Sequence, residues 1–121
     1  MKRYINIVFI ILIFAISSVQ ADNVKEGKKL AFDRKKGNCL ACHQIGNGEL
    51  AGNNGPPLIA MEARFPNRID LFNQIWDATK NNPNSFMPPF GKHGVITKDE
   101  INKILEYLYT LWGKLWTEEI F

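Results

Sequence analysis

One short stretch of this 121-residue chain has residue types and a spacing that indicate specific chemistry: Cys39-Leu40-Ala41-Cys42-His43. This C-x-x-C-H pattern is the attachment sequence of c-type haem. Two thiols one short turn apart can add to the two vinyl groups of one porphyrin, and the histidine that follows can bind the iron. The sequence therefore predicts one haem c, bound covalently through Cys39 and Cys42, with His43 as the proximal ligand.

Two other uses of such a cysteine pair are a zinc site and a thiol redox pair. Tetrahedral zinc would need two further cysteine or histidine ligands, whereas the chain holds only these two cysteines and one other histidine, His93. A thioredoxin-like pair should follow a strand in a βαβ pattern, and no segment near Cys39 alternates in polarity or is rich in β-branched residues. Haem attachment is therefore the favoured interpretation.

Haem iron with one axial histidine either takes a second protein ligand, which favours electron transfer, or keeps an open position for chemistry or gas binding. Three side chains are candidates for this sixth position: Met61, Met87 and His93. Met87 precedes two prolines in a loop, and a weak thioether ligand needs such a rigid setting. Met61 better suits a filler of the core, and His93 lies in a sequence typical of an exposed turn. Met87 is the predicted ligand.

The imidazole that binds iron also needs a hydrogen-bond acceptor for its second nitrogen, because this bond fixes the tautomer and the ring plane. A polar, glycine-bearing loop over residues 44–54 follows the haem motif and leads into Gly55-Pro56-Pro57. Prolines lack a backbone N–H but keep a carbonyl. The Pro56 carbonyl is the predicted acceptor for His43, and a purely rigidifying role of the prolines stays open as the alternative.

The start of the chain is typical of a secretory signal. Two basic residues precede an apolar run over residues 7–16, and a small-residue cleavage site ends at Ala21. Ten apolar residues are too few to span a bilayer as a helix, which takes about 20 residues. We expect a cleaved signal peptide over residues 1–21, a periplasmic cytochrome domain over 22–121, and no membrane span in the mature chain.

Removal of Lys2 and Arg3 with the signal leaves 13 basic and 12 acidic side chains. This near-neutral balance excludes nucleic-acid binding, which requires a strongly basic face. Basic side chains do gather just before the haem motif. They form either a docking rim for an acidic partner or a solvated helix face, and the sequence leaves both open. The cluster consists of Lys25, Lys28, Lys29, Arg34, Lys35 and Lys36.

Two segments before and after the haem motif have apolar residues at helical spacing. The first runs from Asn23, its expected N-cap, to about Phe32. It contains Gly27, which costs a helix about 1 kcal/mol relative to alanine, and a small residue there would let another helix cross closely. The second segment covers residues 68–80.

The strongest helix pattern begins at Thr97, whose hydroxyl can form a capping box with Glu100, and it ends at Gly113. No segment with strand periodicity is long enough to make a sheet. The predicted fold class is therefore all-α, with helices around one cofactor.

Five segments occur in a fixed order along the chain and are informative together. They resemble class I cytochromes c, and more closely the SoxX family, the monohaem subunits of the periplasmic SoxAX sulfur-oxidation complex. The segments are Gly37 to His43, Ala51 to Leu58, Arg64 to Pro66, Met87 to Gly91 and Leu108 to Leu111.

The resemblance implies class I cytochrome c-like helices wrapped around one covalently bound haem, with His43 and Met87 as axial ligands. It implies a SoxA-type cytochrome as heterodimer partner and, through that complex, contact with SoxYZ, the carrier protein whose cysteine receives thiosulfate. Asn54 departs from the family, where an apolar residue is expected, and the tail over residues 114–121 has no counterpart in the resemblance.

The first function hypothesis is an electron-transfer subunit of a SoxAX-type L-cysteine S-thiosulfotransferase, whose haem accepts electrons and passes them to a downstream acceptor. Both thiols are used by the haem, so the isolated chain would not be catalytic and the reactive centre would belong to SoxA. The alternative is a free-standing periplasmic cytochrome that acts as a diffusible electron shuttle. A third hypothesis is a catalytic or sensory haem protein with an open iron position.

Overall fold

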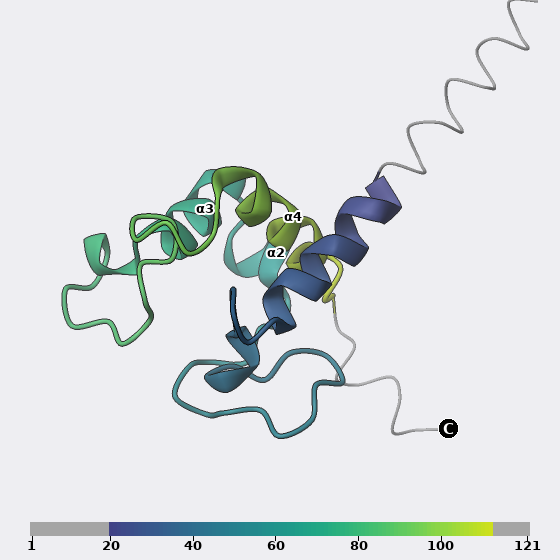
Figure 1. Cartoon of the computed structure of the whole chain (residues 1–121), viewed down its shortest axis with the longest axis horizontal. Coiled ribbons are helices and arrows are strands. Elements are labelled where there is room, and N and C mark those ends of the chain that lie inside the picture. Colours follow the sequence, from purple (N-terminus) through teal and green to yellow (C-terminus); the bar gives the residue numbers. More distant parts are fainter. Residues whose placement is uncertain (1–19, 113–121) are drawn as a thin grey trace, which may run out of the picture.

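The structure is a computed structural model, and it describes residues 20–112. The apolar run of the predicted signal and the tail over 114–121 lie outside the described residues. Within them the chain forms helices and no strand, which confirms the predicted all-α class (Figure 1). The elements are a helix over 20–32, η1 (Cys39–Ala41), α2 (Met61–Arg64), α3 (Arg68–Trp76), η2 (Ala78–Lys80) and α4 (Lys98–Tyr109).

The helix over 20–32 crosses α4 with backbone against backbone (Figure 1). A Cβ atom on Gly27 would lie 1.8 Å from the carbonyl oxygen of Lys103, so only glycine permits this approach. The expected close crossing at Gly27 is therefore present, and packing offsets the weak helix propensity of glycine. The expected N-cap at Asn23 is wrong, because residues 20–22 are already helical and contain no helix breaker.

The capping box at the start of α4 is confirmed. The Thr97 hydroxyl accepts a hydrogen bond from the Glu100 backbone N–H, and the Glu100 carboxylate accepts one from the Thr97 N–H at 2.8 Å. The helix ends at Tyr109, earlier than the expected stop at Gly113, because the Thr110 hydroxyl bonds back to the Tyr107 carbonyl at 2.7 Å. The apolar face of α4 is almost fully buried and consists of Ile101, Ile104, Leu105 and Leu108.

The segment over 68–80 is two helices and not one, which corrects the expected single helix. It contains α3, which packs on α4, and the short η2. The break lies at Asp77, whose backbone is extended (φ −156°, ψ 85°). Its carboxylate accepts hydrogen bonds from the backbone and hydroxyl of Thr79 and so begins a new turn.

Two loops separate these helices and carry the candidate site residues. The loop over 44–60 is irregular and includes the loop predicted over 44–54, and it leads into α2 through Ala60, which has a left-handed backbone (φ 48°). The loop over 81–97 connects η2 to α4 and carries Met87. Within residues 20–112, no helix combines the length and the apolar content that a membrane crossing requires.

We expect Gly27→Ala to destabilise the protein by about 3 kcal/mol, at the upper end of the usual cost of overpacking, because the added methyl group meets backbone atoms that cannot turn away. Denaturant unfolding followed by helical circular dichroism measures this loss. Gly94→Ala is the control, since a Cβ there meets nothing within 4 Å and adds only the strain of a left-handed residue (φ 70°). Equal losses for the two variants would contradict the proposed tight crossing.

Candidate haem site

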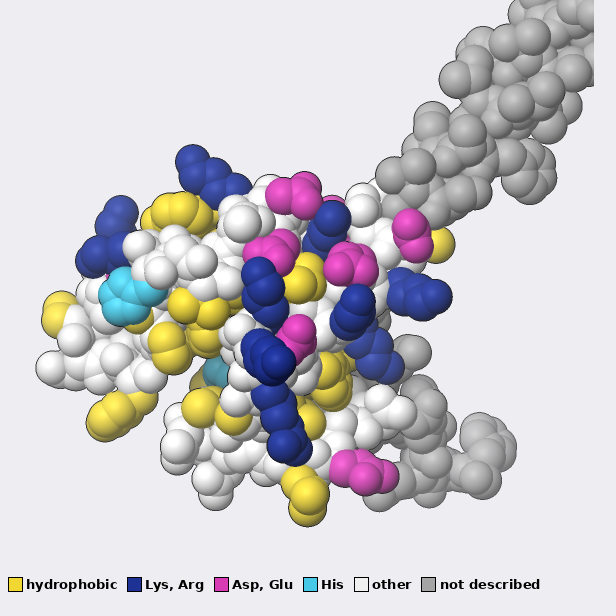
Figure 2. All heavy atoms as spheres, viewed as in Figure 1, with side chains coloured by type: hydrophobic (Ala, Val, Ile, Leu, Met, Phe, Trp, Pro, Cys, Tyr) yellow, Lys and Arg dark blue, Asp and Glu magenta, His cyan; other side chains and the backbone are white. Residues whose placement is uncertain are grey.

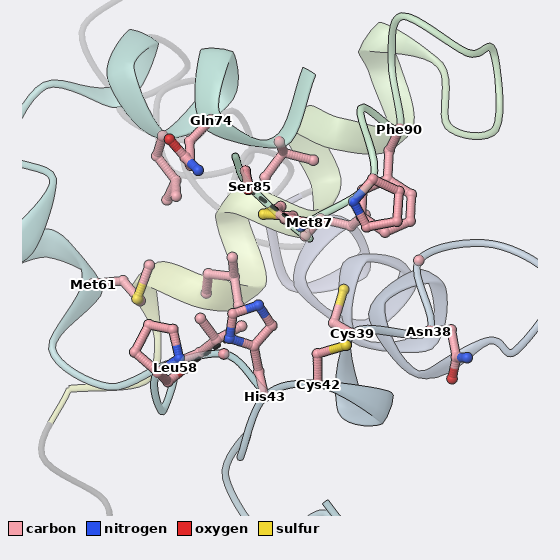
Figure 3. Close-up of a pocket in the computed structure, with 18 of the residues that line it drawn as sticks. Asn38, Cys39, Cys42, His43, Leu58, Met61, Gln74, Ser85, Met87 and Phe90 are labelled. Atoms are coloured by element: carbon pink, nitrogen blue, oxygen red, sulfur yellow. Dashed lines mark hydrogen bonds between the residues drawn. The ribbon is translucent and has the colours of Figure 1, made fainter. Parts of the chain in front are cut away.

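The C-x-x-C-H motif folds as one tight turn. Asn38 enters it with a left-handed backbone (φ 44°), and residues Cys39–Ala41 form the 3-10 helix η1. The His43 N–H then donates to the Cys39 carbonyl at 2.9 Å, so the histidine follows the turn directly. Cys39, Cys42 and His43 all line one cavity (Figure 3).

The ring of His43 is held from two directions. Nδ1 lies 2.7 Å from the Pro56 carbonyl oxygen. Because a carbonyl can only accept, Nδ1 carries the proton, and Nε2 is left with a free lone pair. The ring also lies against the backbone of Gly55, where a Cβ would be 2.3 Å from its Cε1 atom. The contact expected between His43 and Pro56 is present, and the role of His43 as an iron ligand stays a prediction.

The loop over residues 51–58 lies against the motif backbone and so fixes this acceptor. Gly52 donates to the Leu40 carbonyl at 2.9 Å, and Gly55 donates to the Cys42 carbonyl at 2.8 Å. A Cβ on Gly52 would be 1.9 Å from the Ala41 carbonyl oxygen. Gly52 and Gly55 therefore permit the loop to approach the haem motif closely.

The cavity has a volume of about 650 Å³. Its size lies within the range of roughly 300–1,000 Å³ that is usual for ligand and cofactor sites. Figure 2 shows it as a hollow lined by hydrophobic side chains on one face of the molecule. The apolar wall is built from the 51–58 loop, α3, the segment before α4, and α4 itself, and it includes Leu58, Leu71, Ile75, Ile96, Ile104 and Leu108.

The candidates for the sixth position differ in their relation to this cavity. Met87 is partly buried and lies across the cavity from His43 in Figure 3. Met61 also lines the cavity, but it is only 2% exposed and packs in the core, where its sulfur lies 3.5 Å from Nη1 of Arg64. His93 is exposed and is not among the residues that line the cavity.

The environment of the Cys39 thiol differs from that of a catalytic redox thiol. The pKa of the Cys39 thiol is raised to about 11, chiefly by burial; a hydrogen bond from the Cys39 backbone lowers it, and the nearby Cys42 raises it by a smaller amount. Catalytic redox thiols instead have lowered pKa values. Residues 20–112 also contain no group of three or more Cys, His, Asp or Glu side chains that could hold a metal ion. The raised pKa of Cys39 agrees with a cysteine that carries a thioether bond.

Sequence reasoning missed two charged residues near the site. Arg64 lines the cavity and donates to the Pro57 carbonyl at 2.8 Å, next to the carbonyl that holds His43. Asp77 is buried at the end of α3. The order Asp77-Ala78-Thr79 is a helix-start pattern that could have revealed the break, whereas the amphipathic stripe through residue 80 concealed it.

The residues present fit a covalently bound haem. Two thiols and one imidazole with a free Nε2 face an apolar cavity, and Gly55 leaves room for that imidazole where any Cβ would collide with it. Such a donor set matches the histidine and thioether attachment of haem c.

Comparison with known proteins decides the family. Residues 22–108, more than half of the chain, match the family described as "Cytochrome C oxidase, cbb3-type, subunit III". The chain belongs to this family. It is a c-type cytochrome, which holds haem c covalently and transfers electrons.

Individual relatives fall in different assemblies. The cytochrome is 36% identical over 77 residues to an uncharacterized lipoprotein of Aquifex aeolicus (strain VF5), covering 62% of this chain and 37% of that protein. It is 28% identical over 116 residues to the cbb3-type cytochrome c oxidase subunit CcoP of Azospirillum sp. (strain B510), covering 83% and 38%. The chain therefore spans less than two fifths of the length of these curated relatives.

The fold of this cytochrome is similar to that of a chain in the crystal structure of SoxXA from P. pantotrophus. The TM-score is 0.64 at 26% sequence identity, and the similarity covers 72% of this chain and 80% of that one.

We expect Gly55→Ala to displace the His43 ring, because the new methyl group would overlap Cε1. The loss of ordered axial coordination should appear as a mixed-spin ferric spectrum, together with a stability loss of about 1–3 kcal/mol from overpacking. Absorption spectra and thermal unfolding of the holoprotein measure both effects. Gly46→Ala is the control for the spectrum, since its Cβ would meet nothing nearer than the Tyr107 hydroxyl at 3.6 Å and adds only the strain of a left-handed residue (φ 48°). An unchanged low-spin spectrum in Gly55→Ala would contradict the close packing of His43 on this glycine.

Proposed function

We propose that this chain is a periplasmic electron-transfer cytochrome whose iron is held by His43 and Met87, and that it works as the SoxX-type subunit of a SoxAX complex. The observation that carries the ligand assignment is the placement of His43 and Met87 on opposite sides of one apolar cavity (Figure 3). Pro56 supports the ligand set because it accepts the hydrogen bond from His43 Nδ1.

The residues of the chain suit one-electron transfer. Haem c, when bound, supplies a metal centre that exchanges one electron. The Pro56 carbonyl fixes the tautomer and plane of His43, and the apolar wall keeps water away from the centre. A soft, neutral methionine ligand favours the reduced state relative to a second imidazole. The protein therefore contributes orientation, ligand choice and exclusion of water.

The sulfur chemistry of the proposed complex lies outside this chain. The sequence has two cysteines, and both are assigned to the haem. A cysteine-bound sulfur intermediate would then form on the SoxA-type partner, and thiosulfate would be transferred to SoxYZ. This chain would take electrons from that centre and deliver them to a downstream acceptor. The fold similarity to SoxXA and the five ordered sequence segments support this assignment.

A second candidate function is electron delivery within a cbb3-type oxidase. The family match over residues 22–108 and the relative CcoP favour it. In that case the stable partner would be an oxidase subunit. The diffusible shuttle is distinguished from both candidates by having no stable partner.

We predict that Met87→Ala removes the methionine–iron charge-transfer band of the ferric protein near the red end of the spectrum. Water or another imidazole would then favour ferric iron, so the reduction potential should fall, by an amount on the scale of an axial-ligand change. Absorption spectroscopy and potentiometric titration of the holoprotein measure the two effects. Met61→Leu is the matched control, because Met61 lines the same cavity as a core residue. Loss of the band in Met61→Leu and its retention in Met87→Ala would reverse the assignment.

We also predict that the chain purifies from its native host in a one-to-one complex with a SoxA-type cytochrome, and that its mature form begins at Asp22. Size-exclusion chromatography with mass spectrometry measures both. Thiosulfate conjugation to SoxYZ should require the partner, because this chain has no spare thiol. Recovery with oxidase subunits would instead support the second candidate, and a monomer would support the shuttle.

A further inference from the structure

An ion pair between a buried carboxylate and an exposed lysine lies at the base of the Met87 loop. Asp77 is the one charged side chain that is buried within residues 20–112, with 1% exposure. Its Oδ2 atom lies 3.0 Å from Nζ of Lys92, and its Oδ1 atom accepts the two hydrogen bonds from Thr79. Removing a carboxylate from water is costly unless it is paired, so the partner charge matters here.

The carboxylate is ionised at neutral pH. The Thr79 hydroxyl, followed by the Lys92 ammonium, lowers the pKa of Asp77 below its ordinary value, against the opposing effect of burial. Lys92 itself has a side chain that is 58% exposed, so it can leave the pair without being trapped in the core. The attraction between the two charges therefore acts on the loop end that carries Lys92.

Both ends of the Met87 loop are attached to the same short segment, residues 76–78. At the first end, the backbone N–H groups of Asn81 and Asn82 donate to the Ala78 carbonyl at 3.2 and 3.1 Å. At the second end, the Lys92 N–H donates to the Trp76 carbonyl at 3.1 Å. Gly91 lies directly against the Trp76 ring, where a Cβ would be 2.1 Å from Cε3. The loop is closed at its base.

Between these ends the loop has no other hydrogen-bonded attachment to the described helices. Backbone N–H groups over residues 83–90 bond only to partners inside the loop, including the Met87 N–H, which donates to the Ser85 hydroxyl at 3.2 Å. Met87 and Phe90 add apolar packing against the core. The position of Met87 therefore depends on how firmly the base is closed.

We propose that the Asp77–Lys92 ion pair is a clamp that closes the base of the Met87 loop and thereby keeps other ligands from the sixth position on the iron. Asp77 and Lys92 are positioning residues, since neither lines the cavity. The inference rests on the proposed assignment of Met87 as the iron ligand. It adds a control on ligand exchange to that assignment.

Asp77→Asn tests the clamp with little change of shape. The amide oxygen can still accept from Thr79, so the start of η2 is kept, while the charge that attracts Lys92 is removed. Lys92→Gln removes the other charge. We expect the ferric holoprotein of each variant to bind imidazole about tenfold more tightly, or with a rate constant about tenfold higher, than the unchanged protein. This is the scale of a typical coupling between groups in one network.

Two surface variants serve as matched controls. Asp99→Asn removes a carboxylate that pairs with Lys103 on α4, at 78% exposure and away from the loop. Lys98→Gln removes a lysine that lies over the Trp76 ring but is not paired with Asp77. Both should bind imidazole as the unchanged protein does. Lys92→Arg keeps the positive charge, so its imidazole binding should equal that of the unchanged protein.

Stopped-flow absorption with imidazole, the reduction potential and the methionine–iron band measure the outcome. A merely structural role would lower stability in Asp77→Asn and leave imidazole binding at its original value, which would overturn the clamp. If Asp77→Asn fails to accumulate, Lys92→Gln decides in the same way. Met87→Ala separates the two proposals: faster imidazole binding there, without any change in the clamp variants, overturns the clamp alone. Unchanged binding in Met87→Ala overturns the ligand assignment and the clamp with it.

Discussion

The backbone contact between Gly27 and Lys103 is the constraint on which the geometry of this cytochrome depends. The helix over 20–32 ends shortly before the haem motif, and α4 supplies Ile104 and Leu108 to the cavity wall. The separation of these two helices therefore sets the width of the space between the attachment cysteines and that wall. A larger residue at position 27 would push the two helices apart and so displace both sides of the cofactor site, because the contact is between main chains that cannot rotate away.

The two sides of the cavity are held by different kinds of interaction. His43 is fixed by nearby backbone: the Pro56 carbonyl accepts its hydrogen bond, and its ring packs against the Gly55 main chain. Met87 is fixed through a loop whose hydrogen bonds to the rest of the described chain lie at its base. Local opening is easiest where few hydrogen bonds must break, so under the proposed ligand assignment exchange of an axial ligand is expected at Met87. His43 is the more firmly held of the two side chains.

Features that depend on neighbouring residues could be read from the sequence. The haem motif, the Thr97–Glu100 capping box and the amphipathic face of α4 are all local patterns, and the expected hydrogen bond to Pro56 spans only one loop. Features that depend on distant partners could not be read in this way. The ion pair of Asp77 with Lys92 is such a feature, since its partner lies beyond the loop. The break at Asp77 itself has a local signal in Thr79, which periodicity alone overlooked. The early end of α4 is local, because the Thr110 hydroxyl donates to the Tyr107 carbonyl three residues earlier, but the apolar stripe continues past it and hides it from periodicity.

The raised pKa of the Cys39 thiol has a consequence for the order in which this protein is assembled. A pKa near 11 keeps the sulfur protonated at neutral pH once the turn is folded, and a protonated thiol is a poor nucleophile. In an extended chain the same cysteine would return to an ordinary pKa of about 8.5 and would be open to solvent. Covalent tethering is thus favoured while the motif is still unfolded. The cavity would then fold around a haem that is already attached, and the haem would not enter a cavity that has already folded.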